Sequence, residues 1–187
     1  MFDLNEKKFE GTVIFNNGKG GLVKDVNISV EKRKMEEPDT YPNYKLVVSD
    51  GVAKINQGFY YPKANANKTA EANAQGEARE VGRIVHIARA VLGQDYVLPK
   101  VESAKEAYDV LFELVNKNAE GKTFNVFATY GTTGYPSKFL GLRYFNFIES
   151  ADSNPSRLRT GASDLLERLE QDAPAGESSG TKTENWV

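Results

Sequence analysis

The chain has no cysteine and only one histidine among its 187 residues. Without cysteine it has no disulfides, thiol nucleophiles, Cys-ligated zinc or iron–sulfur clusters. A lone histidine excludes any metal site that needs two histidines from one chain. No apolar run approaches the 18 residues typical of a transmembrane helix. The first residues lack the charged and then apolar pattern of a signal peptide, so a soluble cytoplasmic protein is expected.

Hydrophobic residues make up 40% of the chain and aromatic residues 11%, enough for one domain with a real core. Charge is distributed unevenly. Residues 1–148 carry 20 Lys+Arg and 18 Asp+Glu, whereas residues 149–187 carry 4 and 8. We therefore predict a domain over residues 1–149 and an acidic, mostly disordered tail over 150–187, with a short helix at 163–171.

The first 62 residues show the alternation and turn signals of strands. Val26, Ile28 and Val30 alternate with polar neighbours. The glycine-rich stretch 16–21 supplies the positive φ angles of a tight hairpin. Pro62 ends the run. Strands are predicted at residues 9–15, 22–34, 44–48 and 53–61.

Two helices are expected to follow an Ala/Asn-rich loop at 63–76. Residues 77–92 have apolar side chains at helical spacing and end before Gly93. Ser103 and Glu106 form a capping box for a second helix that runs to about residue 118. Strands at 123–130 and 139–148 then close the domain. The order favours a mainly β fold: an OB-like small antiparallel barrel with two helices inserted before the last two strands and a flexible acidic tail. A plain α+β sandwich is the alternative.

Little in the sequence indicates catalysis. Residues 17–21 lack the Walker pattern and lie between two strands, and the carboxylates at 36–39 have no metal-ligand spacing. We expect no enzyme activity, cofactor or metal. Arg79, Arg83 and Arg89 lie seven, three and three residues from His86, roughly on one helix face. This face is either a phosphate-binding stripe or an ordinary solvated surface, and the pattern favours the second.

The last predicted strand is apolar on both faces. Its two sets are Leu140, Leu142, Tyr144 and Ile148 on one face, and Phe139, Gly141, Arg143, Phe145 and Phe147 on the other. Such a strand is either covered on both sides or presents a platform on which bases stack. We lean towards stacking on the face with Arg143.

Aromatic and basic residues recur together elsewhere. Alternation places Tyr60 with Lys54 and Asn56, on the face opposite Phe59 and Tyr61. This mixture favours a surface for single-stranded nucleic acid over an active site. The predicted nucleic-acid-binding residues are Lys19, Lys32, Arg33, Lys34, Lys54, Tyr60, Lys63, Arg79, Arg83, Tyr130, Tyr135, Lys138, Arg143, Phe145 and Phe147.

The layout resembles the OB-fold single-stranded DNA-binding proteins of tailed bacteriophages over residues 8–149. The matching features are a β-meander ending in Phe59-Tyr60-Tyr61-Pro62, a helix ending in Leu92-Gly93, a second helix that contains residues 104–115, and a closing hairpin with Leu142-Arg143-Tyr144-Phe145. The resemblance implies non-specific binding and protection of single strands during phage DNA replication or recombination, in the host cytoplasm.

The resemblance also implies an acidic C-terminus that competes with DNA for the binding groove or recruits replication and recombination proteins. This chain differs from that C-terminal pattern, because it ends in Asn185-Trp186-Val187 rather than in several Asp followed by Pro-Phe. A second hypothesis is a phage structural or assembly protein whose apolar strands form subunit contacts, and the near-neutral body favours it. No membrane partner is expected, and the sequence leaves homo-oligomers open.

Overall fold

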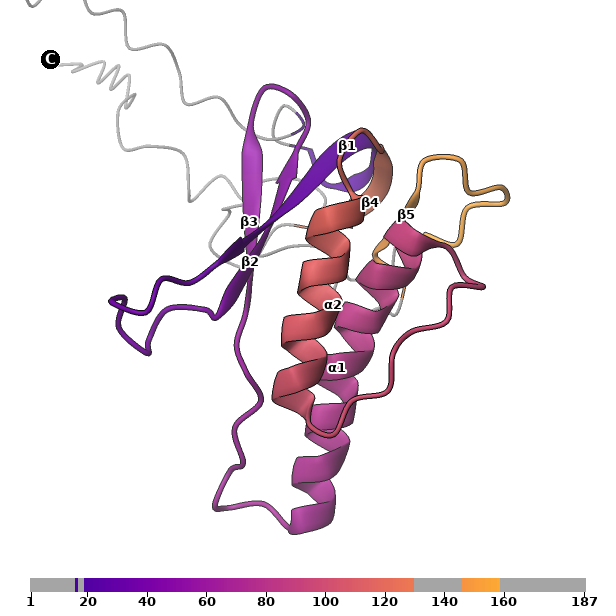
Figure 1. The fold of residues 1–187 in the computed structure, drawn as a ribbon. Coiled ribbons are helices and arrows are strands. Elements are labelled where there is room, and N and C mark those ends of the chain that lie inside the picture. Colours follow the sequence, from indigo (N-terminus) through magenta and orange to yellow (C-terminus); the bar gives the residue numbers. More distant parts are fainter. Residues whose placement is uncertain (1–15, 17–18, 130–145, 159–187) are drawn as a thin grey trace, which may run out of the picture.

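A computed structural model describes residue 16, residues 19–129 and residues 146–158. Within these described ranges lie five strands and two helices (Figure 1). Neither helix is long and apolar enough to cross a bilayer within these ranges. In chain order the elements are β1 (Gly21–Lys32), β2 (Tyr44–Ser49), β3 (Lys54–Phe59), α1 (Ala70–Leu92), α2 (Ala104–Asn118), β4 (Phe124–Ala128) and β5 (Ile148–Ser150).

The strands form one antiparallel sheet in the order β3-β2-β1-β4-β5. The long central strand β1 changes partner along its length. Its C-terminal half pairs with β2 and its N-terminal half pairs with β4. A register shift between Val23 and Val26, with Asp25 at a φ of 56°, marks the change. The antiparallel sheet with two helices before β4 was predicted. Among the described strands the sheet is open, with β3 and β5 at its edges, so these strands do not close a barrel.

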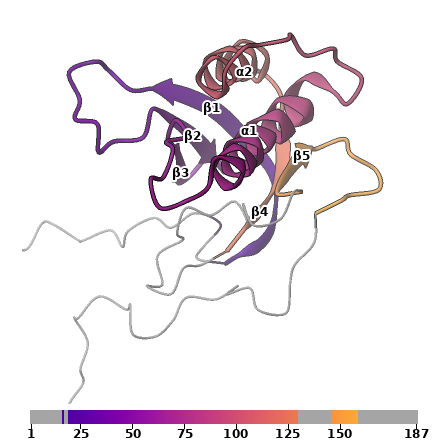
Figure 2. The ribbon, with the colours of Figure 1, turned by 90° about the horizontal axis from the view of Figure 1, so that it is seen from below.

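Both helices lie on the same face of the sheet (Figures 1 and 2), and the buried core residues fill the space between them and the sheet. Phe112 of α2 is fully buried and stacks on Tyr44 of β2 with ring centroids 4.6 Å apart. Ile84 and Ile87 of α1 are also fully buried. The strands contribute alternate side chains to this core: Val26, Ile28, Leu46, Val48, Ile55, Phe59, Phe124 and Val126.

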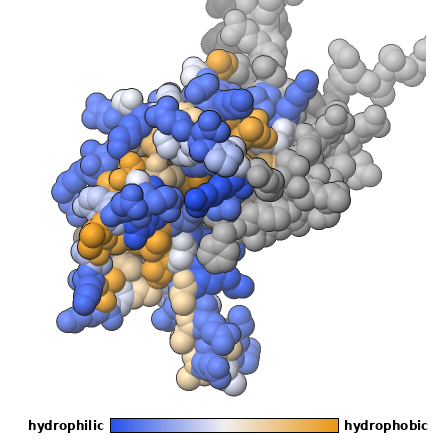
Figure 3. Space-filling model, turned by 90° about the vertical axis from the view of Figure 1, so that its right-hand side faces the viewer, coloured by the Kyte–Doolittle hydropathy of each residue, from blue (hydrophilic) through white to orange (hydrophobic). Residues whose placement is uncertain are grey.

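Helix α1 begins seven residues earlier than predicted. The Thr69 hydroxyl accepts a hydrogen bond from the Ala72 amide at 3.2 Å and caps the helix. Alanine is the strongest helix former, so the Ala-rich stretch continues the helix without any large apolar residue. All of its buried residues, from Ile84 to Val91, lie in the C-terminal half. The N-terminal part projects beyond the sheet (Figures 1 and 3).

Helix α2 confirms the predicted start and end. The Ser103 hydroxyl accepts from the Glu106 amide at 3.1 Å, and the Glu106 carboxylate accepts from the Glu102 amide at 2.9 Å. Side-chain acceptors therefore satisfy two backbone donors at this terminus. The helix ends at Asn118, with Lys117 in its last turn.

The folded body extends beyond the predicted boundary at residue 149. The Ala151 amide donates to Thr123 at 3.1 Å, the Arg157 amide donates to Glu149 at 2.8 Å, and Leu158 is buried. These contacts join residues 151–158 to the folded body. The predicted strand at 9–15, most of the one at 139–148, the helix at 163–171 and the tail beyond 158 lie outside the described residues.

Candidate nucleic-acid interface

The outward side of β3 carries the predicted aromatic and basic pair. Ile55 and Phe59 are buried on the helix side, whereas Lys54 and Asn56 are exposed on the other side. Tyr60 follows β3 and is 52% exposed. Its ring edge lies 3.8 Å from the position that a Cβ would occupy on Gly58. The predicted segregation of these residues is confirmed: Lys54 is exposed at the start of β3 and the Tyr60 ring is accessible just beyond its end.

A groove of about 350 Å³ lies at the C-terminal end of β1. Four cations and two carboxylates line it: Lys32, Arg33, Lys34, Lys45, Glu31 and Glu37. Arg33 pairs with Asp39 at 2.9 Å and donates to the Pro38 carbonyl at 3.2 Å. Among the residues that the structure describes, Lys34 and Lys45 form no salt bridge. The groove therefore presents cationic groups to an incoming anion.

Lys45 connects this groove to the outward side of β3. In the sheet register it lies directly opposite Glu31 of β1 on one side and Gly58 of β3 on the other. Neighbouring strands are about 4.8 Å apart, so the groove, Lys45 and the Tyr60 ring follow one another across three strands. We call this set, Lys34, Lys45 and Tyr60, the basic aromatic patch. Lys54 lies at the other end of β3, opposite Ser49, roughly 20 Å from Tyr60 along the extended chain, and is not part of it.

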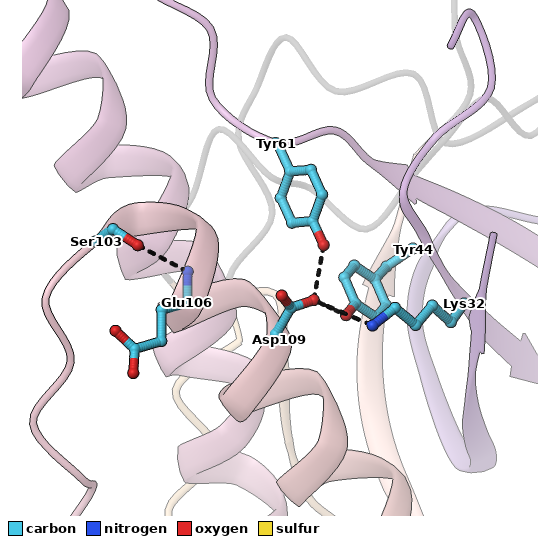
Figure 4. A network of polar contacts seen from close by, with 6 residues as sticks. All are labelled: Lys32, Tyr44, Tyr61, Ser103, Glu106 and Asp109. Carbon is cyan, nitrogen blue, oxygen red and sulfur yellow. Dashed lines mark hydrogen bonds and ion pairs between the residues drawn. The ribbon is translucent and has the colours of Figure 1, made fainter. Parts of the chain in front are cut away.

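A network around Asp109 holds α2 against the sheet beside the groove (Figure 4). One carboxylate oxygen of Asp109 accepts from Tyr61 at 2.7 Å, from Tyr44, and from the Lys32 ammonium at 3.3 Å. Lys105 lies over the Tyr61 ring at 5.5 Å from its centroid. Lys32 thus already has an anionic partner, which makes it a weaker candidate for phosphate than Lys34 or Lys45.

The network shifts the pKa values of Tyr44, Tyr61 and Asp109. Burial, reinforced by the hydrogen bond to Asp109, raises the pKa values of Tyr44 and Tyr61. Burial also opposes ionisation of Asp109, but hydrogen bonds from Tyr44, Tyr61 and Lys32 outweigh it and lower the pKa of that carboxyl. Asp109 therefore remains an acceptor for both hydroxyls throughout the neutral range.

Replacing Asp109 with alanine is expected to lower the free energy of unfolding by about 1–3 kcal/mol at pH 7, because two tyrosine hydroxyls lose their acceptor. The folded-state pKa of Asp109 lies below its ordinary value of 3.8. The advantage of the wild type is therefore complete above that value and shrinks as the pH falls through the folded-state pKa. Urea unfolding at several pH values checks this, with the exposed Asp95→Ala as control. A difference that stays constant into acid would contradict the account.

The basic residues of α1 do not form a stripe of free charges. Arg83 binds the Glu80 carboxylate through two contacts of 2.6 and 2.7 Å, and Arg79 lies 3.9 Å from the same carboxylate. Arg89 donates to the carbonyls of Gln94 and Tyr96 beyond the helix end. His86 is partly buried against the Phe147 ring. Local partners thus occupy most of the predicted phosphate-binding stripe.

Lys19 and Lys63 lie exposed at separate places. Lys19 is next to the start of β1, in a turn where its amide donates to Asn16 at 3.1 Å. About 35 Å of strand separates it from the groove at the other end of β1. Lys63 lies in the segment after Tyr60. Lys63 is therefore close to the patch along the chain, three residues after Tyr60, whereas Lys19 lies far from the patch in the structure.

The buried position of Phe147 overturns the hypothesis that this residue of the last predicted strand stacks on bases. Its side chain is 0% exposed, and its ring packs edge-on against His86 with centroids 5.1 Å apart. The Phe127 amide donates to the Phe147 carbonyl at 2.9 Å. A ring enclosed in this way has no free face for a base, so Phe147 belongs to the core. The predicted residues Tyr130, Tyr135, Lys138, Arg143 and Phe145 lie outside the described residues.

The sequence interpretation missed Lys45 and Asp109. Lys45 alternates with Tyr44 and Leu46, and that period already places it on the outward face of β2. Its register opposite Gly58 is a property of strand pairing that one sequence does not reveal. Asp109 joins the network through contacts 48 to 77 residues away along the chain, for which no local signal exists.

Among the described side chains, no group of three or more acidic or histidine residues is placed to hold a metal ion. A scan against protein-family models finds no match, and comparisons with curated proteins and with solved structures also find none. The functional argument therefore depends on the residues themselves.

Proposed function

We propose that this chain binds single-stranded DNA without base specificity and protects strands exposed during phage DNA replication or recombination. The observation that carries the proposal is the continuity of the basic aromatic patch. Lys45 lines the groove and lies opposite Gly58, and the space over that glycine is bordered by Pro42 and by the edge of the Tyr60 ring. Stacking on an aromatic ring tolerates any base, and lysines follow the phosphates. A non-enzymatic role in the cytoplasm belongs to the same proposal.

The proposal extends to an OB-like barrel. An antiparallel sheet with helices inserted between its third and fourth strands is compatible with part of such a barrel. The outward side of the second and third strands is a common binding surface in that architecture. The basic aromatic patch lies on the corresponding strands, β2 and β3.

Replacing Lys34 or Lys45 with alanine tests the proposal directly. Removing one phosphate contact is expected to reduce the slope of log K against log salt by about 0.7. Thermal stability should change little, because both side chains lie outside the core. Fluorescence anisotropy of labelled oligo-dT over a salt series measures the slope. The matched control is Lys117→Ala, whose ammonium pairs with Glu113 on the exposed surface of α2. Slopes equal to that of the wild type in both groove variants would exclude the groove from the interface.

The sheet edges favour a second candidate function, subunit assembly. Within the described sheet, β3 and β5 each lack a neighbour on one side. An open edge offers backbone donors and acceptors to a strand of another chain. Under this alternative the protein would form concentration-dependent oligomers and its oligo-dT signal would not respond to salt. Light scattering together with the anisotropy series separates the two functions.

A further inference from the structure

A second cavity, of about 510 Å³, lies on the other side of the molecule from β3. Its walls come from the C-terminal part of α1, from β5 and from the segment after β5, which run beside one another in Figure 1. His86 and Arg89 contribute from α1, Glu149 from β5, and Asn154 and Arg157 from the following segment. The side of the molecule that carries α1 and β5 is mainly hydrophilic (Figure 3). The volume falls within the range of small-molecule sites and exceeds what one ion needs.

Two residues of this cavity carry buried atoms without a hydrogen-bond partner. Glu149 is 8% exposed, and its Oε2 accepts from the Arg157 amide at 2.8 Å while Oε1 has no partner. His86 Nε2 is also unpartnered. Buried polar atoms are nearly always satisfied, so each exception calls for a physical reason.

Both unpartnered atoms are acceptors. A ring nitrogen of His86 donates to the Ile148 carbonyl, and since Nε2 has no partner this donor is Nδ1. Burial lowers the pKa of His86, which keeps the ring neutral and leaves a lone pair on Nε2. Glu149 Oε1 is a carboxylate oxygen. A ligand that forms hydrogen bonds with these two atoms must therefore carry N–H donors.

Cationic groups lie at the same cavity. Arg157 is exposed, and its charge is close enough to His86 to act on that ring. Arg89 also lines the cavity, but its Nη1 already donates to the carbonyls of Gln94 and Tyr96. Guanidinium groups recognise phosphate. The cavity thus combines two acceptors with the guanidinium of Arg157, which suits a ligand with an amino group at one end and a phosphate at the other.

We propose that this cavity binds a nucleotide whose base carries an exocyclic amino group, namely adenine or cytosine. The amino group donates to Glu149 Oε1 and His86 Nε2, and the phosphate lies against Arg157. Both acceptor atoms are shielded from solvent, so binding requires the carboxyl and the imidazole ring to turn about their terminal side-chain bonds, torsions with broad energy profiles. The site is independent of the basic aromatic patch. The nucleotide is either free or a unit of a bound strand.

The ligand pair AMP and IMP tests the group at position 6, where IMP has a carbonyl oxygen in place of the amino group and also carries a proton on N1. Calorimetric titration of the full chain should show AMP binding about tenfold to a hundredfold more tightly than IMP, since in the same pose IMP turns its carbonyl oxygen towards the two acceptors. Equal affinities, or no binding of AMP at millimolar concentration, would overturn the proposal. A comparison of the affinities for oligo-dA and oligo-dI then shows whether the bound nucleotide is a free molecule or a unit of a strand. A preference for oligo-dA indicates a unit of a strand, and a preference confined to the mononucleotide indicates a free ligand.

Glu149→Gln is the matched variant. The amide oxygen still accepts from the Arg157 amide, which preserves that contact, and the amide NH₂ offers a donor to the carbonyl of IMP. The AMP-to-IMP affinity ratio should fall towards one in this variant. Asp152→Asn is the control, because Asp152 is an exposed acid of the same segment that does not line the cavity. An unchanged ratio in Glu149→Gln would refute the assignment. If this variant fails to fold, the AMP and IMP comparison on the wild type still decides the proposal.

Discussion

Phe147→Ala is expected to lower the free energy of unfolding by about 3–5 kcal/mol, the usual cost of removing a fully buried phenylalanine ring. The loss arises because the ring fills space against His86 of α1, and its removal leaves a cavity there; the backbone bond from the Phe127 amide to the carbonyl of residue 147 remains in the variant. Urea or thermal unfolding measures it. Oligo-dT affinity of the protein that remains folded should be unchanged, because the ring has no surface to offer a base.

Phe147→Leu is the control for this prediction. It keeps most of the buried volume and should cost clearly less stability than the alanine variant. A small stability loss in Phe147→Ala together with weaker oligo-dT binding would contradict the placement in the core and return Phe147 to the stacking hypothesis.

Tyr60→Ala is expected to lose oligo-dT affinity and keep most of its stability, whereas Phe147→Ala should lose stability and keep its affinity. Loss of one stacking ring should weaken oligo-dT binding by about 1–3 kcal/mol, or roughly fivefold to 150-fold. Stability should fall only slightly, because the side chain is 52% exposed and lies on the side of β3 away from the core. Anisotropy with labelled oligo-dT at low salt measures the affinity, and thermal unfolding measures the stability.

Tyr60→Phe separates stacking from hydrogen bonding. The variant keeps the ring and removes only the hydroxyl, so its affinity should stay close to that of the wild type. Unchanged affinity in Tyr60→Ala would exclude stacking at this position. A loss of the same size in Tyr60→Phe would assign the effect to the hydroxyl instead.

The sequence was most informative where local chemistry decides the structure. The capping residues Ser103 and Glu106 and the end of α2 at Asn118 agree with the prediction. Strands β1 to β4 lie within a few residues of the predicted ranges, because alternation and turn residues act over short distances. The division of Tyr60 from Phe59 followed from the same alternation.

The start of α1 shows where emphasis on large apolar residues misleads. The stretch from Ala70 to Gly76 contains none, so periodicity predicted a loop. Its alanines and the Thr69 cap supply the helix instead, since burial is not needed when propensity and capping act together.

The remaining differences come from long-range pairing. The strand order, with β1 between β2 and β4, depends on contacts about 100 residues apart. The burial of Phe147 was open because both faces of its predicted strand are apolar. The Asp109 network and the register of Lys45 depend on how α2 and the strands meet. In each case one sequence specifies the side chain but not its neighbour.

The central claim is that the basic aromatic patch holds single strands through phosphates and stacking. The measurement that tests it most directly is anisotropy of the full chain with labelled oligo-dT and with a duplex of the same length, each at low and high salt. The account predicts binding to oligo-dT that weakens as salt rises, and weaker binding to the duplex, whose bases are not free to stack. Absence of binding to oligo-dT at low salt, or equal affinity for the duplex, would contradict it.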